Sequence, residues 1–138
     1  MSLSNKVESI VFEKKHVEKL TVTSENIKDY KVLAAVLEQK CEVVTKKSPN
    51  RPWLYIKDAE TLKTLGGVRL NKNSIGTFYI DTRLGHPLNA TMIGVVSKES
   101  KKFISNRIIV NDLQSLEKVC ELIQSLMDSG AIYNGTRN

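Results

Sequence analysis

The sequence has no apolar run that approaches the ~20 residues needed to span a bilayer. Residues 1–16 lack the apolar stretch and the small-residue cleavage site of a secretory signal peptide. Only two cysteines are present, Cys41 and Cys120, and they stand far apart, in no metal-ligand spacing. These absences predict a cytoplasmic protein that does not contact a membrane. Both cysteines are expected to be reduced core residues, and a disulfide between them is the alternative.

Motifs that would fix a reaction are also missing. The sequence holds no G-x-x-x-x-G-K-[ST], no G-x-G-x-x-G and no G-x-S-x-G, which excludes the common phosphate-binding loops and the nucleophile elbow. The pair Gly66 and Gly67 enters a strand and indicates a bulge or a close backbone approach. His16 and His86 have no metal-ligand spacing with the cysteines. We therefore expect no cofactor, and the sequence favours a binding module over an enzyme.

One short segment resembles part of a catalytic signature. Residues 11–15, VFEKK, end in E-x-K, which resembles the last part of the restriction-endonuclease-like signature. That signature also places an acidic residue upstream on a neighbouring strand, and only Glu8 precedes the segment. Asp58, Glu60 and Asp81 form a second possible carboxylate cluster at predicted strand ends. A metal-dependent nuclease therefore remains one alternative.

What the sequence does contain is typical of one globular domain. Its 138 residues are 41% apolar and 26% charged. We expect a single domain over 1–138, with 1–4 and 134–138 frayed. The net charge of +6 is uneven: residues 41–110 hold twelve Lys/Arg against five Asp/Glu, whereas 111–138 hold two against four. This asymmetry indicates a surface that faces a polyanion.

The first forty residues combine an ambiguous segment with a helix. Residues 5–13 fit a helix and a strand equally well, because their apolar residues satisfy both spacings. The β-branched residues around 20–22 favour a strand. Residues 24–40 then place apolar side chains at helical spacing, with Thr23 or Ser24 positioned to cap the free N–H groups.

Between the two predicted helices lies a run of short strands separated by turn residues. The strands share a high content of β-branched and aromatic residues, and they are expected over 42–45, 52–58, 67–71, 75–81, 91–96 and 103–110. A loop is expected over 84–89, because Gly85 and Pro87 interrupt regular pairing. The polar residues 97–102 are expected to form the last turn.

The clearest element is a helix over 112–129, where apolar residues recur at i, i+3, i+4 and i+7. Asn111 is expected to cap it, with Gln114 in the capping-box position, and Gly130 to end it. The element order predicts an α+β fold: an antiparallel sheet of about four to six strands with helices of about 24–40 and 112–129 packed on one face. The expected core residues are Leu33, Leu37, Leu54, Ile56, Val68, Leu70, Phe78, Ile80, Ile108, Val110, Leu116, Cys120, Ile123 and Met127.

Because strand side chains alternate between faces, the predicted sheet divides into two unlike surfaces. One face is apolar and is expected beneath the helices. The other collects aromatic and basic side chains, and a basic turn extends it. The candidate nucleic-acid-binding residues are Trp53, Tyr55, Lys57, Arg69, Tyr79, Arg107, Lys46, Lys47 and Arg51. Rings interleaved with Lys and Arg can stack on bases and neutralise phosphates.

Two interpretations of this face compete with the nuclease. The first is a small basic module that binds DNA or RNA. The second is a protein-interaction or inhibitor domain, in which the same aromatic side chains form a hot spot for another protein or for a second copy in a homodimer.

Overall fold

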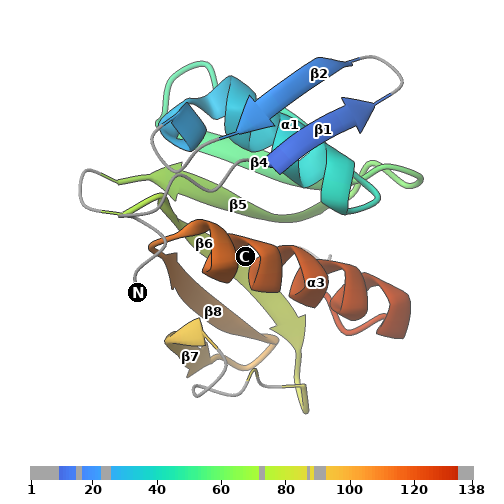
Figure 1. The fold of residues 1–138 in the computed structure, drawn as a ribbon. Coiled ribbons are helices and arrows are strands. Elements are labelled where there is room, and N and C mark those ends of the chain that lie inside the picture. The colour runs from blue at the N-terminus through green and yellow to red at the C-terminus, as the bar shows by residue number, and fades with distance from the viewer. Residues whose placement is uncertain are drawn as a thin grey trace.

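The computed structural model is built around a six-stranded antiparallel sheet (Figure 1). It describes residues 10–14, 17–22, 26–71, 74–86, 88 and 93–133. The strands are β1 (Ile10–Lys14), β2 (Val17–Val22), β3 (Val43–Lys47), β4 (Trp53–Asp58), β5 (Thr64–Leu70), β6 (Gly76–Arg83), β7 (Val95–Glu99) and β8 (Phe103–Val110). The helices are η2 (Asn26–Lys28), α1 (Tyr30–Lys40) and α3 (Leu113–Ser129). The expected frayed ends, 1–4 and 134–138, lie outside the described residues.

The sheet has the strand order β3-β4-β5-β6-β8-β7, and every neighbouring pair is antiparallel. The first four strands form a meander, β8 lies beside β6, and β7 is an outer edge. The predicted α+β class with an antiparallel sheet and two helices is confirmed.

One predicted strand, 91–96, is misplaced. β7 begins only at Val95, directly after Gly94, whose φ of 59° is a left-handed conformation that favours glycine. The strand then continues to Glu99, through residues that the sequence assigned to a turn, because pairing with β8 fixes their backbone. The turn that remains, Ser100–Lys102, is held by the Ser100 amide, which donates to the carbonyl of Phe103 at 2.9 Å.

The N-terminal segment forms a separate two-stranded hairpin. β1 and β2 pair antiparallel, with Ile10 opposite Val22, so the ambiguous stretch is a strand from Ile10 onward. Residues 5–9 of that stretch lie outside the described residues. The hairpin does not join the six-stranded sheet and instead contacts α1, on the side of the molecule where both long helices lie (Figure 1).

Both helices begin later than the sequence indicated. α1 starts at Tyr30, and its cap is Asp29, whose side chain accepts a hydrogen bond from the amide of Lys31 at 2.7 Å. Asn26–Lys28 is a separate 3₁₀ turn, so the predicted helix start at 24 is wrong. A carboxylate is a strong acceptor for free helix amides, which explains why Asp29 sets the first turn.

α3 also begins later than predicted, by one residue, at Leu113. Asp112, not Asn111, caps it, and its carboxylate accepts from the amide of Ser115 at 2.8 Å. Ser115 rather than Gln114 completes the capping box. Gly130 ends the helix as predicted, with a left-handed φ of 69°. Among the described residues, no helix combines the length and apolar character needed to cross a bilayer.

Both long helices cover the same face of the sheet (Figure 1), and the core lies between them and the strands. All fourteen predicted core residues belong there, with Leu70 and Met127 only partly buried. Cys41 and Cys120 are buried free thiols. The sequence did not reveal Asn106, which is fully buried in this face. Its side-chain amide nitrogen lies 2.9 Å from the carbonyl oxygen of Ile80, so its polar group is satisfied within the sheet.

Candidate nucleic-acid interface

The face of the sheet opposite the long helices is named the open face. In Figure 1, α1, α3 and the β1–β2 hairpin all lie on the other side, so no described helix covers it. Strand alternation directs one set of side chains to this face, among them Val44, Lys46, Trp53, Tyr55, Lys57, Arg69, Thr77, Tyr79, Asp81, Val96, Lys98, Ser105, Arg107 and Ile109.

One row of the open face crosses five consecutive strands. Lys46 pairs with Tyr55, Tyr55 with Gly67, Gly67 with Tyr79, and Tyr79 with Arg107. Along the row, a cation is followed by a ring, by a glycine without a side chain, by a second ring and by a second cation. Directly opposite residues in an antiparallel sheet have Cβ atoms about 5 Å apart, so the rings and the charges are close neighbours.

The gap at Gly67 is filled from the side by Trp53. The Trp53 and Tyr79 rings have centroids 4.9 Å apart and are tilted by 58°. A Cβ atom at Gly67 would lie 3.4 Å from the Trp53 ring, so the glycine leaves the room in which the indole leans across β5. Tilted rings at this separation attract each other, which holds the indole in place.

Beside these rings lies the aromatic hollow, a depression of about 210 Å³. Its lining is Arg51, Trp53, Tyr55, Thr64, Gly66, Gly67, Tyr79, Asp81 and Ser105. The two glycines form a floor of bare backbone, and three rings stand around it. This volume is that of about seven water molecules, enough for one flat heterocycle.

A second depression, the basic hollow, lies on the other side of Tyr55. It measures about 260 Å³ and is lined by Lys46, Lys47, Ser48, Pro49, Tyr55, Lys57 and Thr64. Tyr55 and Thr64 line both hollows, so the two are adjacent. A ring-lined space therefore lies next to a space with three lysines.

The structure places eight of the nine predicted residues on the open face or at its edge. Trp53, Tyr55, Lys57 and Tyr79 are half-buried, and Lys46, Arg51, Arg69 and Arg107 are exposed. Lys47 differs, because its strand position directs it toward the helices. Its ammonium lies 4.8 Å from the centroid of the Tyr30 ring and donates to the carbonyls of Ser48 and Arg51, both at 2.9 Å. Lys47 thus stabilises the β3–β4 turn and only borders the basic hollow.

The sequence analysis missed a second aromatic pair at the end of the open face. The rings of Phe103 and Tyr133 stack with centroids 5.1 Å apart and an interplanar angle of 23°. Tyr133 reaches this position because the chain after α3 runs antiparallel beside β6, where the amide of Tyr133 donates to the carbonyl of Asp81 at 2.9 Å. The alternation along residues 103–107 was the available signal for Phe103, whereas none existed for Tyr133.

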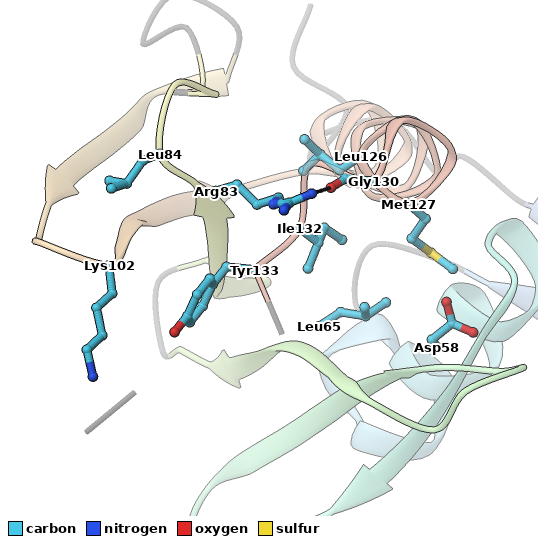
Figure 2. Close-up of a pocket in the computed structure, with 10 residues that line it drawn as sticks. All are labelled: Asp58, Leu65, Arg83, Leu84, Lys102, Leu126, Met127, Gly130, Ile132 and Tyr133. Atoms are coloured by element: carbon cyan, nitrogen blue, oxygen red, sulfur yellow. Dashed lines mark hydrogen bonds between the residues drawn. The ribbon is translucent and has the colours of Figure 1, made fainter. Parts of the chain in front are cut away.

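A separate pocket of about 570 Å³ lies where β5 begins, against the C-terminal end of α3 (Figure 2). Figure 2 shows Leu65 and Ile132 within it, with Arg83 on one wall and Asp58 on the opposite wall. The Arg83 guanidinium lies 3.5 Å from the carbonyl of Gly130. The Asp58 carboxylate already accepts from the amide of Glu60 at 2.8 Å, so it caps the β4–β5 turn.

The carboxylates considered for a nuclease do not form a metal site in the described part of the chain. Asp58 and Glu60 share a turn, whereas Asp81 lies on the open face. No group of three or more His, Cys, Asp or Glu among the described residues is placed to hold a metal ion. Of the E-x-K segment, Glu13 belongs to β1, and Glu8 and Lys15 lie outside the described residues.

Chemically, the two hollows offer stacking surfaces, bare backbone and cations within one continuous area. Such a surface suits a ligand that is flat and apolar at one end and anionic at the other. Comparisons of the chain with protein-family models, with curated proteins and with solved structures found no match.

Proposed function

We propose that the protein binds single-stranded nucleic acid on its open face. The observation that carries this proposal is the adjacency of the aromatic hollow and the basic hollow on either side of Tyr55. A nucleotide combines two matching parts, a flat base that suits the aromatic hollow and a nearby phosphate that suits the basic hollow. The base enters the aromatic hollow, and the neighbouring phosphates lie against Lys46 and Lys57.

Single strands are favoured because the rings must reach the face of a base. Trp53 and Tyr79 already contact each other at 4.9 Å, so a base stacks beside this pair and not between its rings. In a duplex both faces of each base are covered by neighbouring pairs. Each base stacked on an aromatic side chain is worth ~1–3 kcal/mol, and this energy is available without opening a duplex.

The charge distribution supports the same face. The open face carries several cations, among them Lys46, Lys57, Arg69 and Arg107. Among the side chains that alternation directs to this face, the acidic one is Asp81. The exposed side of α3 instead carries Glu117 and Glu121. Phosphates are therefore attracted to one side of the molecule and repelled from the other.

The proposal also includes a location in a reducing compartment and a role in binding without catalysis. Buried free thiols at Cys41 and Cys120 suit the cytoplasm, where disulfides are rare. Affinity for an arbitrary sequence is expected at about micromolar or weaker, as for other nonspecific contacts to phosphates.

The test is a salt titration of binding to a single-stranded oligonucleotide, followed by fluorescence of Trp53, the one tryptophan of the chain. Stacking on a base should quench this signal. Arg69→Ala should weaken binding to all sequences alike and reduce the salt slope by about one. Lys118→Ala removes an exposed cation from α3 and should leave both quantities unchanged.

Trp53→Ala probes the stacking part separately. Binding of this variant is followed by anisotropy of a labelled oligonucleotide, and it should lose affinity for single strands more than for duplex. Trp53→Phe retains a ring and should lose less. If the folded wild type binds no nucleic acid even at low salt, the proposal fails.

A protein partner, including a second copy, is the second candidate, and one observation favours it. Val96 and Ile109 are 53% and 43% exposed on the open face near the edge strand β7. Exposed apolar side chains beside an unpaired strand edge suit a protein interface. Sedimentation of wild type and Val96→Glu tests self-association: a dimer that dissociates in the variant would place this candidate first.

A further inference from the structure

A third depression, the edge groove, lies where α1 begins, beside the edge strand β3. It measures about 670 Å³ and is lined by Lys28, Asp29, Tyr30, Lys31, Ala34, Thr45, Lys47, Leu54 and Leu70. Lys47 also lines the basic hollow, so the two depressions adjoin at β3. We infer that the edge groove holds the next part of the same nucleic-acid strand, which leaves the open face by passing around β3. This inference rests on the proposed function and extends its site.

The lining of the edge groove offers both kinds of surface that a nucleotide needs. Leu54, Leu70 and Ala34 pack against the core and give the groove an apolar part. Lys28 and Lys31 are exposed at its border, where α1 begins. The groove has about three times the volume of the aromatic hollow, about 670 Å³ against about 210 Å³, so it has room for more than one base.

Tyr30 gives the groove a ring whose position is fixed within the protein. Its hydroxyl donates to the carbonyl of Pro52, and the ammonium of Lys47 lies 4.8 Å from the ring centroid. Tyr30 is half-buried, so part of the side chain stays accessible. A ring that is already held in place loses little conformational freedom when a base packs against it, which favours binding.

The charge of the lining suits phosphates. Three lysines are present against one carboxylate, that of Asp29, which accepts a hydrogen bond from the amide of Lys31 at 2.7 Å. A second carboxylate lies at the β3 wall, where Glu38 accepts from the amide and the hydroxyl of Thr45 at 2.9 and 2.7 Å. Protein donors therefore meet both carboxylates, and the lysines provide the excess positive charge.

The dimensions of the fold set the length of strand that reaches the edge groove. The two glycines of the aromatic hollow belong to β5, which lies two strands from β3. Neighbouring strands are about 4.8 Å apart, and a helix with its side chains is about 10 Å across. A path from β5 around β3 to α1 therefore covers ~20 Å, or about six nucleotides at ~3.4 Å each. A trimer is too short to contact both sites, whereas a ten-mer is long enough.

The test compares uridine oligomers of three and ten nucleotides. Binding is followed by Trp53 fluorescence, because this signal reports the open face and not the edge groove. The double variant Lys28→Ala/Lys31→Ala should bind the ten-mer about 10-fold or more weakly at low salt, and its salt slope should fall by about 1.4, which is about 0.7 for each lost phosphate contact. Its binding of the trimer should not change. Lys118→Ala, on the exposed side of α3, is the matched control and should alter neither oligomer's binding.

Ala34→Leu probes the apolar part without changing any charge. Leucine suits a helix, and its larger side chain occupies space in the groove. This variant should bind the ten-mer about 3-fold or more weakly, with an unchanged salt slope and unchanged trimer binding. Ten-mer binding that neither variant affects, or equal losses for both oligomers, would overturn the inference and leave the proposed function standing. No binding of either oligomer by the wild type would overturn both.

Discussion

The two faces of the same sheet differ in their exposure to solvent. On the helix-covered face, Phe78 and Ile108 are fully buried opposite one another. One position away, Tyr79 after Phe78 and Arg107 before Ile108, the next pair is also opposite one another but faces solvent at least in part. The backbone is shared, so the difference lies only in alternation. A single set of strands can thus supply a core on one side and a contact surface on the other, without extra elements.

Two adjacent glycines show how closely the faces are linked. A Cβ atom at Gly66 would lie 2.3 Å from the carbonyl oxygen of Tyr79, so this residue is needed for β5 and β6 to pair. At Gly67 the nearest atoms lie at 3.4 Å, and one of them belongs to the Trp53 ring. The first glycine is therefore needed for strand pairing, whereas the second makes room for the Trp53 ring.

The largest expected effect is the protection of the buried thiols on the covered face from chemical modification. Cys41 and Cys120 lie in the covered core, and the thiolate is the form that reacts. A hydrogen bond with Cys41, together with burial, raises the pKa of Cys120, so this thiol stays protonated across the range near pH 8.5 where an unfolded cysteine ionises. Modification of Cys120 by a disulfide reagent at pH 8.5 should be about a thousandfold slower in the native protein than in denaturant. Rapid labelling of Cys120 in the folded protein would show that this face opens.

Removing packing from the covered face should cost the most stability. Ile123 is almost fully buried on the inner side of α3, and Ile123→Ala should lower the free energy of unfolding by ~2–5 kcal/mol through lost contacts and a cavity. Urea unfolding followed by circular dichroism measures this change. Glu121→Ala on the exposed side of the same helix is the matched control and should change it by under about 0.5 kcal/mol. Similar losses for both would contradict the assigned helix face.

Filling the floor of the aromatic hollow should separate binding from stability. Gly67→Val places two methyl groups beside the Trp53 ring, so a base loses its stacking position and binding should weaken by ~1–3 kcal/mol. Valine suits a strand, so the unfolding free energy should change by less than about 1 kcal/mol. Gly67→Ala, which adds one atom at ordinary contact distance, is the milder comparison. Unaltered oligonucleotide binding by a folded Gly67→Val would remove the hollow from the interface.

The smallest effect is expected on the outer surface of α3. Reversing Glu117 and Glu121 to Lys should leave nucleic-acid binding unchanged or slightly stronger, because these carboxylates repel phosphates and do not belong to the open face. The pair between Glu117 and Lys40, at 3.8 Å, is solvent-exposed, so its loss should cost under about 1 kcal/mol. Anisotropy at several salt concentrations provides the measurement. Complete loss of binding by a folded double variant would move the contact surface to α3.

Local patterns were sufficient to predict the two faces. Alternation along Trp53–Asp58 and Phe103–Val110 needs no knowledge of partners, and it placed the rings and the core side chains correctly. The apolar stripe of α3 was equally local. Helix starts were less certain, because Asn111 and Asp112 are adjacent capping residues and only the folded backbone selects between them.

Features that depend on distant partners could not be predicted. β7 extends to Glu99 only because β8 lies beside it. Asn106 is tolerated in the core because Ile80, on another strand, accepts its hydrogen bond. Lys47 was assigned to the binding face by its charge, although its position in the β3 register turns it toward Tyr30. In each case the deciding contact joins residues that a sequence pattern does not connect.

The pairing of the chain after α3 with the end of β6 has a consequence for the timing of folding. The amide of Arg83 donates to the carbonyl of Ala131, and its side chain reaches Gly130, which lies 47 positions away. During synthesis, the meander from β3 to β6 can therefore form early, but this corner of the sheet stays incomplete until α3 has been made. Contacts between distant positions slow folding, so closure of this corner should be a late event on the ribosome. The end of the open face that contains Phe103 and Tyr133 is then assembled last, after the rest of this face already exists.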